Sequence, residues 1–111
     1  MASMAARYDE AVALHEGGNV EAAVEKLQAL LGEEPGYALA HAALSVYLGE
    51  LGRHEEAVEH AQKVCELEAH DPFSYVALSL ICQKAGRIQE AEQALMLARQ
   101  ADFAAQQRDK G

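Results

Sequence analysis

Five histidines are the first side chains of this chain to consider as metal ligands or as acids and bases. Glu56 and His60, and likewise Glu66 and His70, lie four positions apart, a spacing that places both side chains on one face of a helix. A metal site needs roughly four converging ligands, and neither pair has a further ligand at a matching spacing. We therefore interpret both pairs as surface contacts and predict no metal site. The histidines are His15, His41, His54, His60 and His70.

Two cysteines and several adjacent acidic residues are the remaining candidates for chemistry. Cys65 and Cys82 fit no metal-binding spacing and are too few for a disulfide framework. We expect both thiols to be reduced and to fill small apolar spaces between helices, rather than to act in redox chemistry. Glu55-Glu56 is interpreted as part of a solvated face, because paired catalytic carboxylates need a cleft that shifts one pKa. The sequence therefore predicts no catalytic residue, no metal and no cofactor, and it does not predict an enzyme.

The charge balance of the chain is acidic and uneven. The chain has 9 basic and 18 acidic residues, a formal net charge of −9. Residues 1–71 have 14 acidic and 4 basic residues, a net of −10, whereas residues 72–111 have 4 acidic and 5 basic residues, a net of +1. Nucleic-acid binding depends mainly on Lys and Arg, so this balance argues against a nucleic-acid partner. We interpret the acidic residues mainly as a solvated face, with attraction of basic partners as the alternative.

The composition and the N-terminal residues of the chain indicate its cellular location. The stretch MASMAARYDE lacks the basic and apolar regions of a signal peptide. No apolar run reaches the roughly 18 residues that a membrane span needs. Hydrophobic residues make up 50% of the chain, which favours a folded protein over a disordered one. We therefore predict a soluble, cytoplasmic protein that does not insert into a membrane.

A six-residue stretch occurs twice with small changes. GRHEEA at 52–57 and GRIQEA at 86–91 begin 34 positions apart, and the same shift aligns the whole chain without a gap. Repetition at a period of roughly 20–50 residues indicates stacked units. We predict one domain of three units, 4–37, 38–71 and 72–105, with a frayed tail at 106–111. The aligned residues include Gly18, Gly52 and Gly86, and Ala23, Ala57 and Ala91.

Each unit is predicted to contain two helices joined by a tight turn. In the third unit, Asp71 can cap a helix that has Pro72 at its first position, where the missing N–H costs nothing. Gly86 is expected to end that helix, because glycine accepts the left-handed conformation. A second helix is expected to start near Ile88. We expect the aligned alanine, here Ala91, to lie where the two helices approach most closely, so that a larger side chain would push them apart.

These features resemble the tetratricopeptide repeat family. The 34-residue period, the small residues after Leu44 and Leu78, the turn glycines, the aligned alanines and Pro35 at the end of unit one all match, over residues 4–105. The fourth position of each unit lacks the Trp that the family has there, and units two and three lack the Pro that closes a repeat of the family. The resemblance implies an all-α fold, an α-solenoid of three antiparallel helix pairs whose first helices line a concave groove. Such proteins bind peptides, extended segments or helices of partners, and catalysis is not their usual function.

The resemblance places one set of side chains on the concave side. Residues 38–49 and 72–83 contain no Asp, Glu, Lys or Arg, and a helix that is apolar on every face is normally buried on every face. Packing within each unit covers only one side, so we predict that a partner with apolar anchors covers the other. Glu50 and Lys84 at the margin could set the orientation of that partner. The predicted partner-binding residues are Tyr8, Val12, Leu39, Ala42, Val46, Glu50, Phe73, Val76, Leu80 and Lys84.

Three alternatives to a bound partner segment stay open. A tightly curled superhelix would let the same side chains cover one another. Self-assembly would pair the groove or the end faces with another copy, building a dimer or a larger scaffold. A small chaperone would use the groove to shield a hydrophobic segment of one client. Glu92 and Arg99 make two stacking positions charged only in the last unit, so we expect the array to end there.

One activity of the family is argued against by the same columns. Some tetratricopeptide co-chaperones hold the C-terminal carboxylate of heat-shock chaperones with a clamp of Lys, Asn and Arg. The corresponding places in this chain offer no such donor, so we do not expect that activity. They are occupied by Tyr8, Val12, Ala43, Phe73 and Ala77.

Overall fold

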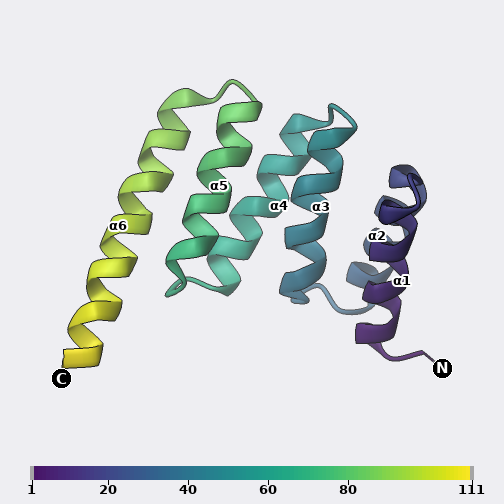
Figure 1. Ribbon diagram of the computed structural model, residues 1–111, viewed down its shortest axis with the longest axis horizontal. Helices are drawn as coiled ribbons and strands as arrows, with labels where there is room; N and C mark the ends of the chain where they lie inside the picture. The colour runs from purple at the N-terminus through teal and green to yellow at the C-terminus, as the bar shows by residue number, and fades with distance from the viewer. Residues whose placement is uncertain (1, 111) are drawn as a thin grey trace.

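The computed structural model describes residues 2–110, and every regular element in that range is a helix. Each helix packs against the next one in the chain, so the helices form a row of antiparallel pairs (Figure 1). This arrangement confirms the predicted all-α solenoid. The helices are α1 (Met4–Glu16), α2 (Val20–Glu33), α3 (Ala38–Glu50), α4 (His54–Leu67), α5 (Pro72–Lys84) and α6 (Ile88–Lys110).

Equivalent helices begin at a constant interval along the chain. The first helices, α1, α3 and α5, begin at residues 4, 38 and 72, and the second helices, α2, α4 and α6, begin at residues 20, 54 and 88. α6 is longer than the others, with 23 residues against 13 in α5, and it extends past the start of α5 (Figure 1). Residues 106–110, expected as a frayed tail, are helical instead, since they contain no Gly or Pro to end the helix. Gly111 lies outside the described residues.

Each pair turns at a glycine with a left-handed backbone. The φ values are 90°, 77° and 79° at Gly18, Gly52 and Gly86, a region that residues with a β-carbon rarely adopt. In the second turn, the N–H of Arg53 donates to the C=O of Leu48 at 2.9 Å, and the other two turns repeat this bond. The bond satisfies one of the last carbonyls of the first helix and reverses the chain, as expected for a helix that ends at glycine.

The residue after each turn glycine anchors the start of the second helix. Arg53 donates to Glu56 at 2.7 Å, and Arg87 donates to Glu90 at the same distance. In the first pair, Asn19 caps α2 instead. The glycine, the Arg–Glu pair and the alanine that GRHEEA and GRIQEA share therefore all belong to one turn structure.

The starts of the first helices are capped unevenly. The Oδ1 atom of Asp71 accepts from the N–H of Phe73 at 3.0 Å, and Pro72 occupies the first turn of α5, as predicted. Ser3 caps α1 in the same way, but Tyr37 before α3 makes no side-chain cap. The position of α3 therefore depends more on its packing against neighbouring helices.

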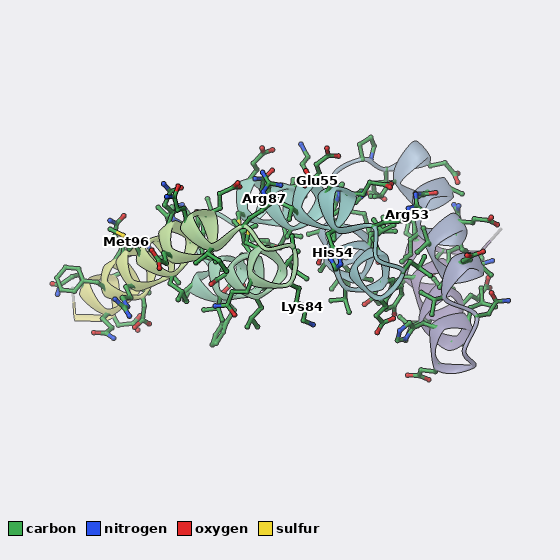
Figure 2. All side chains as sticks on the ribbon, turned by 90° about the horizontal axis from the view of Figure 1, so that it is seen from above. Arg53, His54, Glu55, Lys84, Arg87 and Met96 are labelled. Carbon is green, nitrogen blue, oxygen red and sulfur yellow. The ribbon has the colours of Figure 1, made fainter. Side chains whose placement is uncertain are left out.

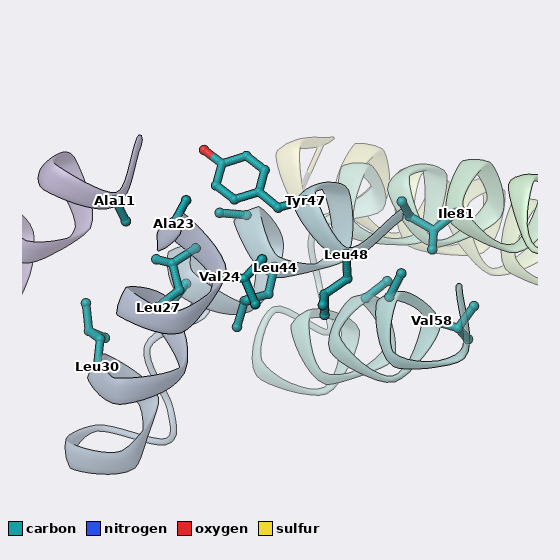
Figure 3. Close-up of a cluster of buried hydrophobic side chains, with 14 of the residues drawn as sticks. Ala11, Ala23, Val24, Leu27, Leu30, Leu44, Tyr47, Leu48, Val58 and Ile81 are labelled. Atoms are coloured by element: carbon teal, nitrogen blue, oxygen red, sulfur yellow. The ribbon is translucent and has the colours of Figure 1, made fainter. Parts of the chain in front are cut away.

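The hydrophobic core runs along the row between the two sets of helices (Figure 3). Ala23, Ala57 and Ala91 are each buried to at least 99%. Their burial fits the expected close approach of paired helices, where only a small side chain has room. Larger side chains fill the space on either side of these contacts, and the fully buried leucines are Leu27, Leu30, Leu44 and Leu48.

A hydrogen bond from the fourth column joins consecutive units. Nε2 of His41 contacts the C=O of Pro35 at 2.7 Å, and the hydroxyl of Tyr75 donates to the C=O of Ala69 at 3.2 Å. In both cases the acceptor lies six positions before the donor, at the end of the preceding unit. The fourth position of units two and three, which lacks the family's Trp, thus carries a polar link to the preceding unit.

We predict that Ala57→Leu lowers the free energy of unfolding by about 1–3 kcal/mol, because the extra methyl groups overpack the closest approach of α3 and α4. Urea unfolding followed by circular dichroism measures the change. Ala29→Leu, at an exposed position of α2, is the matched control and should change stability little. Equal stability of the Ala57→Leu protein and the wild type would contradict the assignment of Ala57 to a closed contact.

Candidate functional site

Five large apolar side chains on α3 and α5 are exposed to solvent. Leu39 and Val46 are seven positions apart on α3, so both point to one side of that helix. Phe73, Val76 and Leu80 share one side of α5 for the same reason. The exposed fractions of these side chains run from 38% at Val76 to 77% at Phe73. We call this surface the apolar wall, and its exposure shows that the side chains do not cover one another within a single copy.

A pocket of about 230 Å³ lies between α3 and α5, in the apolar wall. Val46 and Leu80 of the wall line it, together with Ala42 and Lys84 from the predicted set. The remaining lining residues were not among the predicted site residues. Two of them lie on α4, the second helix of its pair, whereas the prediction considered only first helices. The only sequence signal for that part is the apolar character of Ala61 and Val64 on a helix expected to pack. The other lining residues are Ser45, Ser74, Ala77 and Ile81.

A smaller hollow of about 120 Å³ adjoins the pocket, and its lining combines polar side chains with the apolar Val46 and Ile81. The side chains of Glu50 and Lys84 line it, as does His54. Nδ1 of His54 is buried and has no hydrogen-bond partner among the described residues. Lys84 projects on one side of the layer of helices, opposite to Arg53, Glu55 and Arg87 (Figure 2). The carboxylate of Glu50, the ammonium of Lys84 and the unpaired nitrogen of His54 therefore lie at one end of the apolar wall. We call this hollow the polar hollow.

The first unit contributes little to this surface. Tyr8 is half-buried, with its ring centroid 6.4 Å from that of Tyr37, and Val12 is also half-buried. Neither residue lines the pocket or the polar hollow. The structure thus brings together the predicted residues of α3 and α5, and it leaves Tyr8 and Val12 apart from them.

His15 and Glu50 connect the first unit to the margin of the wall. Nε2 of His15 lies 2.6 Å from Oε2 of Glu50. The imidazole of His15 also stacks on the ring of Tyr47, with centroids 4.0 Å apart and planes inclined by 5°. Burial, followed by the nearby Tyr8 and Glu50, raises the pKa of Tyr47, so its hydroxyl stays neutral. Glu50 is therefore already partly held in place before any partner binds.

His41 and His60 form a second histidine contact, between α3 and α4. Their Nδ1 atoms lie 2.9 Å apart. The Pro35 carbonyl only accepts, so Nε2 of His41 must carry a proton, and in the neutral ring its Nδ1 accepts from His60. Two charged rings would place two hydrogens between the Nδ1 atoms and break the bond. The expected surface pair of Glu56 with His60 is wrong, because Glu56 binds Arg53 and His60 turns inward.

The two cysteines are free and buried. Cys65 lies at the packed boundary of α4 and α5, where its Sγ is 3.3 Å from the C=O of Ser74. Burial raises the pKa of the Cys65 thiol to about 11, and burial also raises the pKa of Cys82. A neutral buried thiol is a weak nucleophile, so both cysteines fit the expected packing role.

Residues 2–110 contain neither a cluster of metal-binding side chains nor a helix that could span a membrane. No three His, Cys, Asp or Glu side chains in that range converge as metal ligands would. No helix in that range combines the length and the apolar character that a membrane crossing requires.

A row of antiparallel helix pairs, with an apolar wall built from the first helices of two pairs, defines a solenoid repeat protein. Residues 38–71 match the model of the tetratricopeptide repeat family. This match shows that residues 38–71 form a tetratricopeptide repeat, the middle helix pair of the row. Proteins with this repeat generally act as protein–protein interaction modules rather than as enzymes.

Two solved structures share the fold. A crystal structure of MamA superposes with a TM-score of 0.84 and 22% sequence identity, over 95% of this chain and 61% of the MamA chain. A second structure, described as MamA MSR-1 C2, has a TM-score of 0.79 and 18% identity, over 93% of this chain and 59% of the other. This chain thus spans about three-fifths of the MamA chains, and at these identities the likeness establishes the fold alone. No curated protein matches the chain.

We predict that acidification destabilises the protein through His60. Burial, and then the neighbouring His41, lower the pKa of His60, so the unfolded chain takes up this proton more readily than the folded one. The resulting stability is present above about pH 6.5, the ordinary histidine pKa, and declines as the pH falls below it. His60→Gln can still donate to His41 but does not titrate. Thermal unfolding across pH 5 to 8 should show a smaller acid loss for His60→Gln; equal slopes would contradict this role.

We predict that both thiols of the folded protein react slowly with a thiol reagent at pH 8. With a pKa of about 11, Cys65 is a thiolate in about one molecule in a thousand at that pH, and burial also restricts access. Labelling with a chromogenic disulfide should be slow in buffer and fast in urea, where both residues are exposed. Fast labelling of the folded protein would show that the boundary of α4 and α5 is open.

Proposed function

We propose that the protein holds an apolar segment of a partner protein against the apolar wall. The observation that carries the proposal is the exposure of five large apolar side chains on two helices, with a pocket between those helices that Val46 and Leu80 line. Apolar surface in contact with water costs about 25 cal/mol per Å², and exposed apolar patches on folded proteins usually mark interaction sites. Covering Leu39, Phe73 and Leu80 would give the partner segment most of its binding free energy.

The pocket suggests the size of the main anchor. An apolar cavity of about 150 Å³ holds a benzene molecule, so the 230 Å³ pocket has room for a leucine or an aromatic side chain. The side chains at its mouth, Val46 and Leu80, would contact both sides of such an anchor. A partner segment with a single large apolar residue at its centre fits this geometry.

The spacing of the wall favours a helical partner segment. Side chains seven positions apart on α3 and on α5 form two ridges, and an amphipathic helix places its own apolar residues at the same interval. The polar hollow would then orient the segment, because Glu50 attracts a basic residue and Lys84 an acidic one. The net charge of −9 supports a protein partner over a nucleic acid. The free thiols of Cys65 and Cys82 fit a reducing compartment such as the cytoplasm.

The double variant Leu39→Glu, Leu80→Glu tests the proposal. Both positions are about half exposed, 54% and 53%, so the new carboxylates stay solvated and the fold should persist. The probe is a set of peptides selected from a phage-displayed random library on the wild-type protein. We expect these peptides to carry apolar residues at helical spacing and to lose at least about tenfold in affinity for the double variant, the effect of removing roughly one apolar anchor.

The matched control is Ile88→Glu, which changes a side chain as exposed as Leu39, 54%, at the start of α6 and outside the pocket. The control should bind the selected peptides as tightly as the wild type in fluorescence polarisation. Circular dichroism of all three proteins confirms folding. Equal affinity of the folded double variant for the peptides would overturn the proposal.

A further inference from the structure

The outer side of α6 is a second apolar surface that the proposed function does not use. Met96 and Phe103 lie seven positions apart on it and are 57% and 62% exposed. Among the described residues, α6 packs against α5 and no other helix. Its buried side chains, Ala91, Ala94 and Ala98, all face α5. The side with Met96 and Phe103 is therefore left uncovered in a single copy, and part of it lies beyond the start of α5 (Figure 1).

The two exposed surfaces have the same axial spacing. At about 1.5 Å per residue, side chains seven positions apart on a helix are about 10 Å apart along its axis. Met96 and Phe103 on α6 therefore have the spacing of Leu39 and Val46 on α3. Phe73 and Leu80 on α5 repeat this interval. A helix with the side chains of α6 laid along the apolar wall would place both of its anchors between the two ridges at once.

The charges of the two surfaces also favour their contact. Each surface carries one charge of each sign: Glu92 and Arg99 are exposed on α6 near Met96, and Glu50 and Lys84 are exposed at the margin of the wall. Residues 1–71 have 4 basic and 14 acidic residues, a net of −10, and the remaining residues have a net of +1. The wall joins α3 of the acidic part to α5 of the near-neutral part, so its contact with α6 of another copy brings fewer like charges together than contact between two acidic parts would.

We propose that the outer side of α6 of one copy occupies the apolar wall of a second copy. This inference rests on the proposed function, since it names the occupant of the same wall. Each copy then uses two different surfaces, so a pair keeps one free wall and one free α6 and can add further copies. The protein would form open chains whose length rises with concentration.

Two variants block the two surfaces separately. Leu80→Glu blocks the wall and leaves α6 intact, whereas the double variant Met96→Glu, Phe103→Glu blocks α6 and leaves the wall intact. All three side chains are more than half exposed, so the substitutions bury no charge. Light scattering coupled to size exclusion should show the wild type rising above its monomer mass of 12.0 kDa as concentration increases. Each variant alone should remain at the monomer mass at every concentration.

Mixing the two variants gives the decisive result. One intact wall and one intact α6 remain in the mixture, so we expect complexes of one copy of each variant, of twice the monomer mass and no larger. Ala29→Glu, at an exposed position of α2 outside both surfaces, should assemble like the wild type. A mixture that stays monomeric would overturn the inference, as would self-association of Leu80→Glu, which would indicate symmetric pairing of α6. If the wild type stays monomeric but binds the selected peptides at its wall, this inference is wrong and the proposed function stands.

Discussion

The left-handed glycine at the end of each first helix is the constraint on which the architecture depends. Only glycine adopts φ near +80° without strain, and the bond across the turn then sets where the second helix begins. The reversal brings the two helices together, and Ala23, Ala57 and Ala91 are buried where they pack. Because every pair turns in the same way, the first helices are placed on one side of the row, and the apolar residues of α3 and α5 form a single wall.

The parts of the structure that follow from local causes were predictable from the sequence. Turn glycines and the Asp71 cap act within a few positions, and the 34-residue interval repeats the same local pattern, so the helices and their pairing could be inferred. The exposed residues of α3 and α5 were also foreseen, since no charged residue interrupts either helix until its last turn. Contacts between positions far apart in the sequence could not be predicted, because they depend on how each helix is rotated about its axis relative to its neighbours. The pairing of His41 with His60 is of this kind.

The candidate site was predictable only in part for the same reason. Sequence columns indicate which side of a first helix faces outward, but not whether a neighbouring unit covers it. Tyr8 packs near Tyr37, so it is half-buried, while Phe73 in a later unit is the most exposed residue of the wall. Ala61 and Val64 of α4 line part of the pocket. Both are residue types that also occur at ordinary core positions, so the sequence does not mark them as part of a site. The spacing of α3 and α5, and not their composition, creates the pocket.

The hydrogen bonds from His41 to Pro35 and from Tyr75 to Ala69 have a consequence for how such a chain can change over time. In each bond the acceptor is a main-chain carbonyl, which is present whatever residue stands at that position. The donor is an imidazole in one unit and a phenol in the next. The contact between units therefore tolerates substitution as long as the new side chain places a polar hydrogen within reach of that carbonyl. A chain built on such contacts can diverge far in sequence, or exchange one unit for another, while the stacking of its helix pairs persists.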